Sequence, residues 1–269
     1  MKDRQLYYVA GFAAVVPLVV SAAATAGEFS QGDTYTNVSD PWPNEASHNA
    51  IINEIYGDMG GDFTGSGETT GTTHQIYEND QLRLERVSDT SADPQDMNNP
   101  DVNNGDQIWH NDSPMTVSAR ARFASFTGNF GFMSGTTGTD NFQSLFSIQE
   151  GDYGYDLDAS ATLTIDGEFR WAYDVEETGQ LVSSSQADNP DEEDFMVTYR
   201  VTNLDGSNPD FNNGLPVYLV FWEDFPGFDY DYNDLVIELA VIPLPAPLAM
   251  GLLGLAGVAA VRRRRGKQQ

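Results

Sequence analysis

The chain has 269 residues, no cysteine and a formal net charge of −28, with 41 Asp and Glu against 13 Lys and Arg. The lack of cysteine excludes a disulfide framework, a thiolate nucleophile and a thiolate metal site. The negative charge repels nucleic-acid phosphates and anionic lipid headgroups, which excludes both as partners of the folded part. The negative charge attracts cations. Two explanations for the excess of acidic residues stay open, namely specific calcium binding and a surface adapted to a saline habitat.

The first 26 residues have the layout of a secretory signal peptide. Lys2 and Arg4 precede an apolar stretch over 6–20, and the segment from Ala24 to Ala26 supplies the small-x-small pattern that signal peptidase accepts. We expect cleavage after Ala26. An uncleaved N-terminal anchor is the alternative, and the short apolar core disfavours it.

The region between the two ends is expected to fold as an exported domain. Residues 27–241 hold 6 Lys and Arg against 40 Asp and Glu, a formal charge of −34. A domain of this length can bury a sizeable core without disulfides. We divide it into an N-terminal segment over 27–80 with one short helix and a β-sandwich domain over 81–241.

One helix is predicted near the start of this region. Ile51, Ile52, Ile55 and Tyr56 fall on one face of the segment over 44–57, which follows a proline and stops at a glycine. We expect this helix to pack across the mouth or flank of a sheet.

The rest of the region reads as short strands. Apolar and polar residues alternate over 115–123 and 195–201, which predicts strands with one buried face. The apolar runs at 217–222 and 235–241 are typical of central strands covered on both sides. Further strands are predicted at 81–87, 129–133, 144–148, 162–165 and 168–173. The turn pair at 166–167 predicts a hairpin between the last two. This pattern favours a mainly β fold, a β-sandwich of jelly-roll type with one short helix.

The stretch over 222–235 is the densest in metal-binding side chains. Asp229, Asp231 and Asn233 stand at alternating positions, the spacing by which ligands of a calcium loop converge. Three more acidic residues raise the oxygen count toward the six to eight or so that calcium prefers, namely Glu223, Asp224 and Asp234. The pattern is not an EF-hand, because Asp234 stands where that loop needs glycine and no glutamate follows at the twelfth place. The alternative is a turn in which Asp229 and Asp234 cap strand ends and the tyrosines pack on the sheet.

The same stretch resembles the C-terminal signature of a bacterial extracellular domain family of unknown function. In that signature a strand ending in [FW]-E-D leads through P-G to D-x-D-[FY]-N-D-[LV] and a final strand, and residues 222–236 match it. The resemblance implies a secreted β-rich domain on surface or matrix proteins and no established activity.

A second acidic region lies earlier in the chain. It holds Asp89, Asp93, Asp96, Asp101 and Asp106. We interpret it as a solvated loop unless calcium neutralises it.

The sequence offers little support for catalysis. His48, His74 and His110 lie in unrelated contexts, without a metalloprotease pair or a nucleophile elbow, and are expected to be ordinary surface or half-buried residues. The four tryptophans could be core residues or platforms for sugars, and they are Trp42, Trp109, Trp171 and Trp222.

The C-terminal 28 residues, 242–269, combine three features. The proline cluster comprises Pro243, Leu244, Pro245, Ala246 and Pro247. The run over 241–261 has 21 residues without a charge, long enough for a transmembrane helix. Cationic flanks stay on the cytoplasmic side, and the arginines that follow are Arg262, Arg263, Arg264 and Arg265.

This order resembles the PEP-CTERM class of sorting signal, in particular its VPLPA-CTERM variant. The resemblance implies that a membrane protease of the exosortase type cuts near the proline motif and moves the ectodomain to the cell surface. Ile242 stands where the variant has valine, and no glutamate lies between the prolines, so a cut at the P-E-P site does not follow. A simple tail anchor is the alternative.

Together these features predict an exported, non-enzymatic structural or binding protein of the cell surface or extracellular matrix. We expect Ca²⁺ to stabilise it, an exosortase-type protease to sort it, and polysaccharide or matrix proteins to be its partners. The membrane is a partner only through the C-terminal helix before processing. A secreted hydrolase or lyase acting on polysaccharide is the alternative, which a cleft with two carboxylates about 5 to 10 Å apart would favour.

Overall fold

The computed structural model describes residues 35–39, 41, 45–66, 75–89, 95–97, 105–149, 152–155, 157–204, 211–212, 215, 217–224 and 230–242. The predicted signal peptide and the sorting segment from Pro243 onward lie outside these residues. Among the described residues no helix has the length and apolar character needed to cross a membrane.

The larger sheet has nine strands and is antiparallel throughout, in the order β1-β2-β3-β13-β14-β15-β6-β10, with β9 also paired to β6. Its strands are β1 (Thr64–Ser66), β2 (Ile76–Glu78), β3 (Leu82–Arg86), β6 (Met115–Arg122), β9 (Gly154–Tyr155), β10 (Ser160–Leu163), β13 (Met196–Asn203), β14 (Val217–Trp222) and β15 (Leu235–Val241). The most apolar runs of the sequence, at β14 and β15, therefore lie in the middle of the sheet, as predicted.

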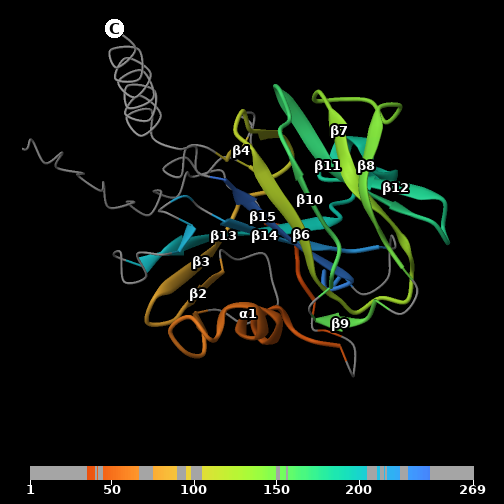
Figure 1. Ribbon diagram of the computed structural model, residues 1–269. Helices are drawn as coiled ribbons and strands as arrows, with labels where there is room; N and C mark the ends of the chain where they lie inside the picture. The colour runs from red at the N-terminus through yellow and green to blue at the C-terminus, as the bar shows by residue number, and fades with distance from the viewer. Residues whose placement is uncertain are drawn as a thin grey trace, which may run out of the picture.

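The smaller sheet has six strands in the order β4-β5-β11-β7-β8, with β12 also paired to β11. Its strands are β4 (Gln95–Asp96), β5 (Trp109–His110), β7 (Gly128–Ser134), β8 (Phe142–Ile148), β11 (Glu168–Val175) and β12 (Gln180–Ser183). Two short 3-10 helices, η1 (Gln186–Asp188) and η2 (Pro190–Glu192), follow β12. Figure 1 shows this sheet stacked against one side of the larger one.

Aromatic side chains fill the space between the two sheets. Phe130 of the smaller sheet packs on Trp222 of the larger one with ring centroids 5.8 Å apart, and Trp109 packs on Tyr218 at 5.2 Å. Trp109, Trp171 and Trp222 are fully buried, so these three are core residues and not platforms for sugars. The prediction of a mainly β fold with packed sheets is confirmed.

The connectivity departs from a jelly roll. β13, β14 and β15 are consecutive both in the chain and in the sheet, and the strands divide nine to six, whereas a jelly roll distributes about eight strands over two Greek keys. The predicted hairpin at 166–167 is also wrong. β10 pairs with β6 in the larger sheet while β11 pairs with β7 in the smaller one, so the turn carries the chain from one sheet to the other.

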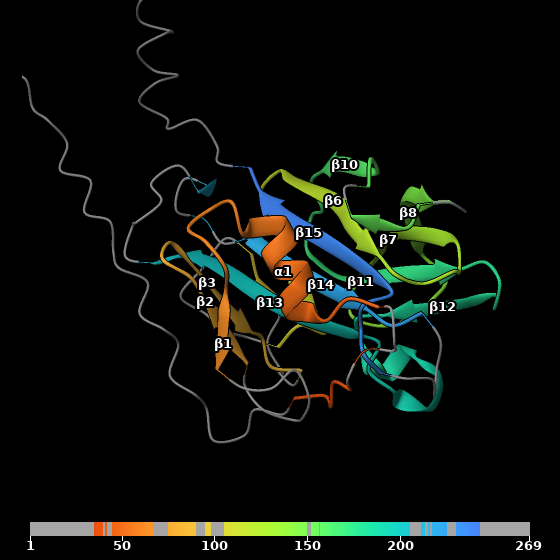
Figure 2. The same ribbon diagram turned by 90° about the horizontal axis from the view of Figure 1, so that it is seen from below.

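A second core lies on the outer face of the larger sheet, under helix α1 (His48–Tyr56). Figure 2 shows α1 crossing this face over β14 and β15. Ile51 and Ile52 are fully buried there, as the sequence predicted. The helix begins later than predicted because Ser47 is its N-cap, with the Ser47 hydroxyl accepting a hydrogen bond from the Ala50 N–H.

The N-terminal segment belongs to this body. β1 and β2 extend the larger sheet from the β3 side, and the segment also contributes Val38 and Phe63 to the second core. This second core buries the outer face of β13 as well, so the prediction of one buried face for that strand is wrong.

Candidate functional site

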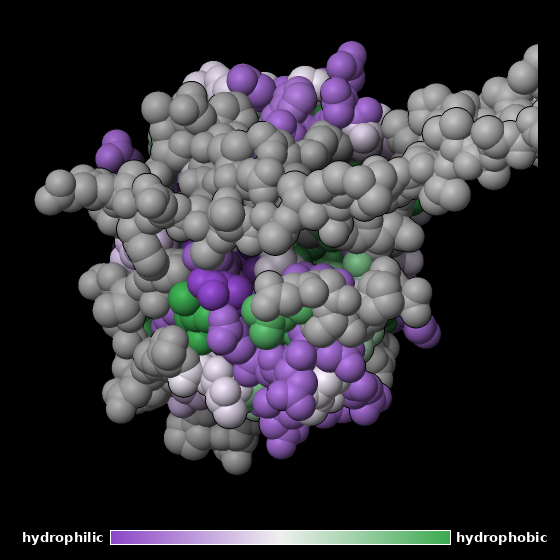
Figure 3. Space-filling model, turned by 90° about the vertical axis from the view of Figure 1, so that its left-hand side faces the viewer, coloured by the Kyte–Doolittle hydropathy of each residue, from purple (hydrophilic) through white to green (hydrophobic). Residues whose placement is uncertain are grey.

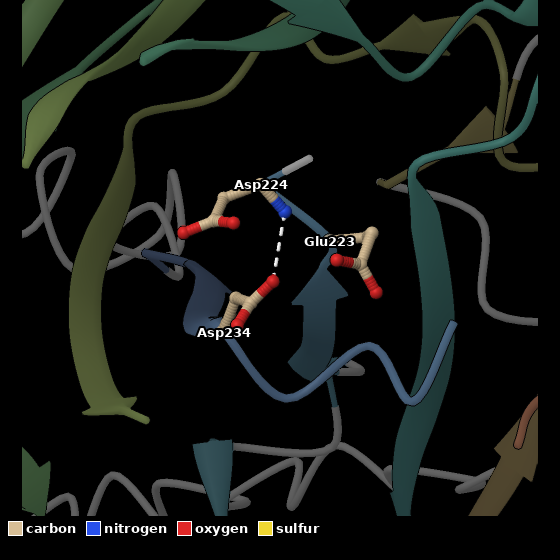
Figure 4. Close-up of side chains that lie close together, drawn as sticks. All are labelled: Glu223, Asp224 and Asp234. Atoms are coloured by element: carbon tan, nitrogen blue, oxygen red, sulfur yellow. Dashed lines mark hydrogen bonds between the residues drawn. The ribbon is translucent and has the colours of Figure 1, made fainter. Parts of the chain in front are cut away.

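Three of the predicted metal ligands come together where β14 ends and β15 begins. Trp222 and Leu235 are paired in the sheet, so Glu223 and Asp224, which follow β14, lie beside Asp234, which precedes β15. One carboxylate oxygen from each of the three lies within 4.8 Å of the others. The Asp224 backbone N–H donates a hydrogen bond of 2.9 Å to Asp234 Oδ2, which closes the turn (Figure 4). We call Glu223, Asp224 and Asp234 the acidic group.

The spacing and burial of the acidic group fit a calcium ion. Calcium–oxygen distances are about 2.3–2.6 Å, so two oxygens on opposite sides of one ion lie about 5 Å apart. Glu223 and Asp224 are only 1% and 5% exposed, so water screens their charges weakly. A divalent cation would offset the repulsion among the three carboxylates and could be held by them in one- or two-oxygen contacts.

Two other predicted ligands, Asp231 and Asn233, form hydrogen bonds within the loop. Asn233 Nδ2 donates hydrogen bonds to Asp231 Oδ2 at 2.9 Å and to the Ala46 carbonyl oxygen at 3.1 Å. The Asn233 N–H also donates to Asp231 Oδ1 at 3.3 Å. Asp231 and Asn233 are therefore joined to each other, and Asn233 ties the loop to the residue before Ser47, the N-cap of α1. Asp229 lies outside the described residues.

Two tyrosines next to Asp231 have a left-handed backbone. Tyr230 has φ 55° and Tyr232 has φ 56°, a conformation that costs free energy for residues with a side chain. The surrounding contacts hold it, since the Tyr232 hydroxyl donates to the Asp194 carbonyl oxygen at 3.0 Å and the Ser39 N–H donates to the Tyr230 carbonyl oxygen at 2.8 Å. The loop that leads to Asp234 is thus fixed on both sides.

His48 joins α1 to the same loop. Its Nε2 donates to the Asp231 carbonyl oxygen at 2.8 Å, and its Nδ1 lies 3.0 Å from the Tyr199 hydroxyl. Burial, and then the charge of Arg86, lowers the pKa of His48 to about 3. The prediction of a surface or half-buried residue is wrong for His48, which is a neutral structural link.

Sequence reasoning missed a second buried acidic cluster. Asp89 and Asp106 are each 1% exposed, not solvated as predicted, and they lie near Asp194 and the fully buried Arg86. Burial raises the pKa of Asp106, and the negative charges of Asp89 and Asp194 raise it further. The Thr36 N–H donates to Asp89, and the Thr36 hydroxyl donates to Asp194 Oδ2 at 2.6 Å.

The sequence placed Asp89 and Asp106 in one acidic region but gave no signal that Asp194, which is 105 residues after Asp89, joins them. Arg86 offsets part of the cluster's charge, with Nη2 3.5 Å from Asp89 Oδ1. Arg86 therefore compensates one negative charge of the cluster, and the raised pKa of Asp106 favours the neutral, protonated form of that carboxyl.

Comparisons with known proteins add little. No protein-family model matches the chain, and no curated protein matches it. Among solved structures, a lectin of Chromobacterium violaceum in complex with alpha-methyl-fucoside is similar at a TM-score of 0.32 and 17% identity, covering 52% of this chain and 97% of the lectin chain. A likeness at this level carries no argument about function, which therefore depends on the residues of this chain.

Proposed function

We propose that the protein is an exported, non-enzymatic component of the cell surface or extracellular matrix whose β-sandwich is stabilised by calcium. The observation that supports this function is the acidic group, in which three carboxylates meet within 4.8 Å at the junction of two central strands. On the face drawn in Figure 3, the described residues that are not covered are mostly hydrophilic, with smaller hydrophobic areas between them.

The arrangement disfavours the hydrolase or lyase alternative at this position. Glycosidase carboxylates lie about 5–9.5 Å apart and flank a substrate. In the acidic group, Glu223 and Asp224 are only 1% and 5% exposed, which prevents a polysaccharide from reaching them.

The sorting part of the proposal depends on the sequence alone. The proline cluster, apolar run and arginines Arg262 to Arg265 favour processing by a protease of the exosortase type, with polysaccharide or matrix proteins as partners after release. The membrane is contacted through the C-terminal helix before processing.

Calcium is expected to raise the melting temperature of the purified protein. A ligand that binds only the folded state adds RT ln(1 + [L]/Kd), which is about 2.7 kcal/mol for calcium at about 100 times its Kd. Magnesium should add less, because it gives up its water reluctantly. The measurement is thermal unfolding in calcium, magnesium or sodium chloride at matched ionic strength, since any salt screens the repulsion among the carboxylates.

The double variant Asp224→Asn/Asp234→Asn tests whether the acidic group is the site. It keeps the hydrogen-bond acceptor at 234 and removes two charges, so the calcium-dependent shift should disappear while the fold persists. Asp166→Asn/Glu168→Gln removes two exposed charges elsewhere and should respond to calcium like the parent. Equal protection of the parent and the first variant would rule out calcium binding by the acidic group.

A further inference from the structure

A hollow of about 300 Å³ opens at the edge of the larger sheet, between β10 and its neighbour β6. Its volume is at the small end of ligand pockets, which are about 300–1,000 Å³, and suits a single sugar ring. Four of its six lining residues are polar, and the six are Ser118, Ala119, Arg120, Leu157, Asp158 and Ser160.

A β-bulge places Arg120 in this hollow. On β15, Val236 pairs with Ala121 and the next residue, Ile237, pairs with Ala119, so Arg120 is the extra residue without a partner on that strand. Bulges aim a side chain away from the regular alternation and are frequent beside binding sites. The Arg120 side chain is 31% exposed, and its Nη1 lies 3.7 Å from Glu238 Oε1.

The polar side chains of the hollow are available to a ligand. In the part of the chain that the structure describes, Arg120 has the ion pair with Glu238 and no hydrogen bond of its side chain. The side chains of Ser118, Asp158 and Ser160 likewise form no hydrogen bond with described residues. The hollow therefore presents guanidinium donors, carboxylate acceptors and two hydroxyls that both donate and accept.

These charges favour a neutral ligand. The positive Arg120 is balanced by Glu238, and Asp158 adds a further negative charge, so an anion would be repelled. Two neighbouring hydroxyls of a sugar can accept from a guanidinium and donate to a carboxylate at the same time. Leu157 offers an apolar contact to the ring.

Aromatic side chains continue the surface beside the hollow. Tyr155 of β9 pairs with Ala121, the residue that follows the bulge. Tyr153 is 59% exposed, and both tyrosines pack against Phe123, with ring centroids 5.7 and 5.4 Å away. Tyrosine combines a flat apolar face with a polar tip, which suits contact with the next sugar of a chain.

We propose that this hollow binds one unit of a neutral polysaccharide, with Arg120 and Asp158 holding two adjacent hydroxyls and the tyrosines supporting the neighbouring unit. The inference rests on the proposed surface or matrix function and names its ligand class and its site.

Native affinity electrophoresis of the full-length protein in detergent tests the proposal, with dextran, mannan or galactan in the gel and dextran sulfate as the charged counterpart. We expect at least one neutral polymer to retard the protein and dextran sulfate not to. Arg120→Gln and Asp158→Asn should each weaken binding about tenfold or more, since each removes a charged hydrogen-bonding group. Arg83→Gln and Asp166→Asn lie outside the hollow and should bind like the parent.

Three results would overturn the proposal. The first is that no neutral polymer retards the protein, and the second is that dextran sulfate retards it more strongly than the neutral polymers do. The third is that both hollow variants bind like the parent and have unchanged melting temperatures. The calcium-dependent melting shift, measured on the same samples, separates this failure from failure of the proposed calcium-stabilised function. Asp158 is exposed, so its variant reports on binding even where Arg120→Gln does not fold.

Discussion

His48 connects helix α1, strand β13 and the loop of the acidic group through one imidazole ring. Its folded pKa of about 3 lies below its unfolded value of 6.5, so the folded state holds the neutral form. The stability that follows from this difference is fully present above the unfolded pKa and is lost progressively as the pH falls toward the folded pKa. Nothing in the sequence around residue 48 separates this role from that of an ordinary histidine, because both bonding partners come from distant segments.

Between pH 7 and 5, without calcium, the parent is expected to lose about 2 kcal/mol more unfolding free energy than His48→Gln, which has no titrating group at this position. Urea denaturation of both proteins at each pH gives the difference. The raised carboxyl pKa values of Asp89, Asp106 and Asp194 act in the opposite direction, since a folded state that prefers protonated carboxyls gains stability as the pH falls. That contribution is common to both proteins and cancels. Parallel curves for the two proteins would contradict the neutral, buried role of His48.

At the scale of elements, the period of apolar residues predicted most of the long strands. On β6, every second residue from Met115 to Ala119 points into the core between the sheets. The apolar runs at β14 and β15 lie in the middle of the larger sheet. The turn signal at 166–167 predicts a hairpin that does not form, because such a signal is local. It shows that the chain reverses, but the partner of β10 is β6, about 40 residues earlier, which only packing between the sheets decides. The short strands β4, β5 and β9 have two residues each, too few for a period.

Gly131 on β7 is a position where the sheet itself requires glycine. The β7–β8 register shifts at this residue, and a Cβ at 131 would lie 2.0 Å from the Gln143 carbonyl oxygen. Gly131→Ala is expected to lower the unfolding free energy by about 1–3 kcal/mol, because backbone must move to admit the methyl group. Ser144→Ala, at the exposed residue paired with Gly131, is the control and should change it by less than about 0.5 kcal/mol. Equal denaturation midpoints for the two variants would contradict this, because they would show that the β8 backbone moves to admit the methyl group without a measurable loss of stability.

At the scale of the whole molecule, β15 separates the acidic group from Ile242, the last residue that the structure describes. Asp234 precedes Leu235 at one end of the strand, and Ile242 follows Val241 at the other. At about 3.3 Å per residue the two ends are about 20 Å apart. The sequence predicted the acidic residues and the strand, but the separation of Asp234 from Ile242 follows only from the extent of β15 in the folded chain.

Processing of the C-terminal segment can be tested on the protein from its native cell surface. We expect the protein recovered from its native cell surface to begin at Gly27 and to lack Arg262 to Arg265, because the proposed sorting protease would cut near the proline cluster, before the apolar run. Intact mass spectrometry measures both ends at once, together with any attached glycan or lipid. Replacing the four arginines with neutral residues should weaken membrane retention and orientation before processing. A mature surface form that keeps the arginines would favour simple anchoring, with the sandwich and its acidic group held at the membrane by the uncut helix.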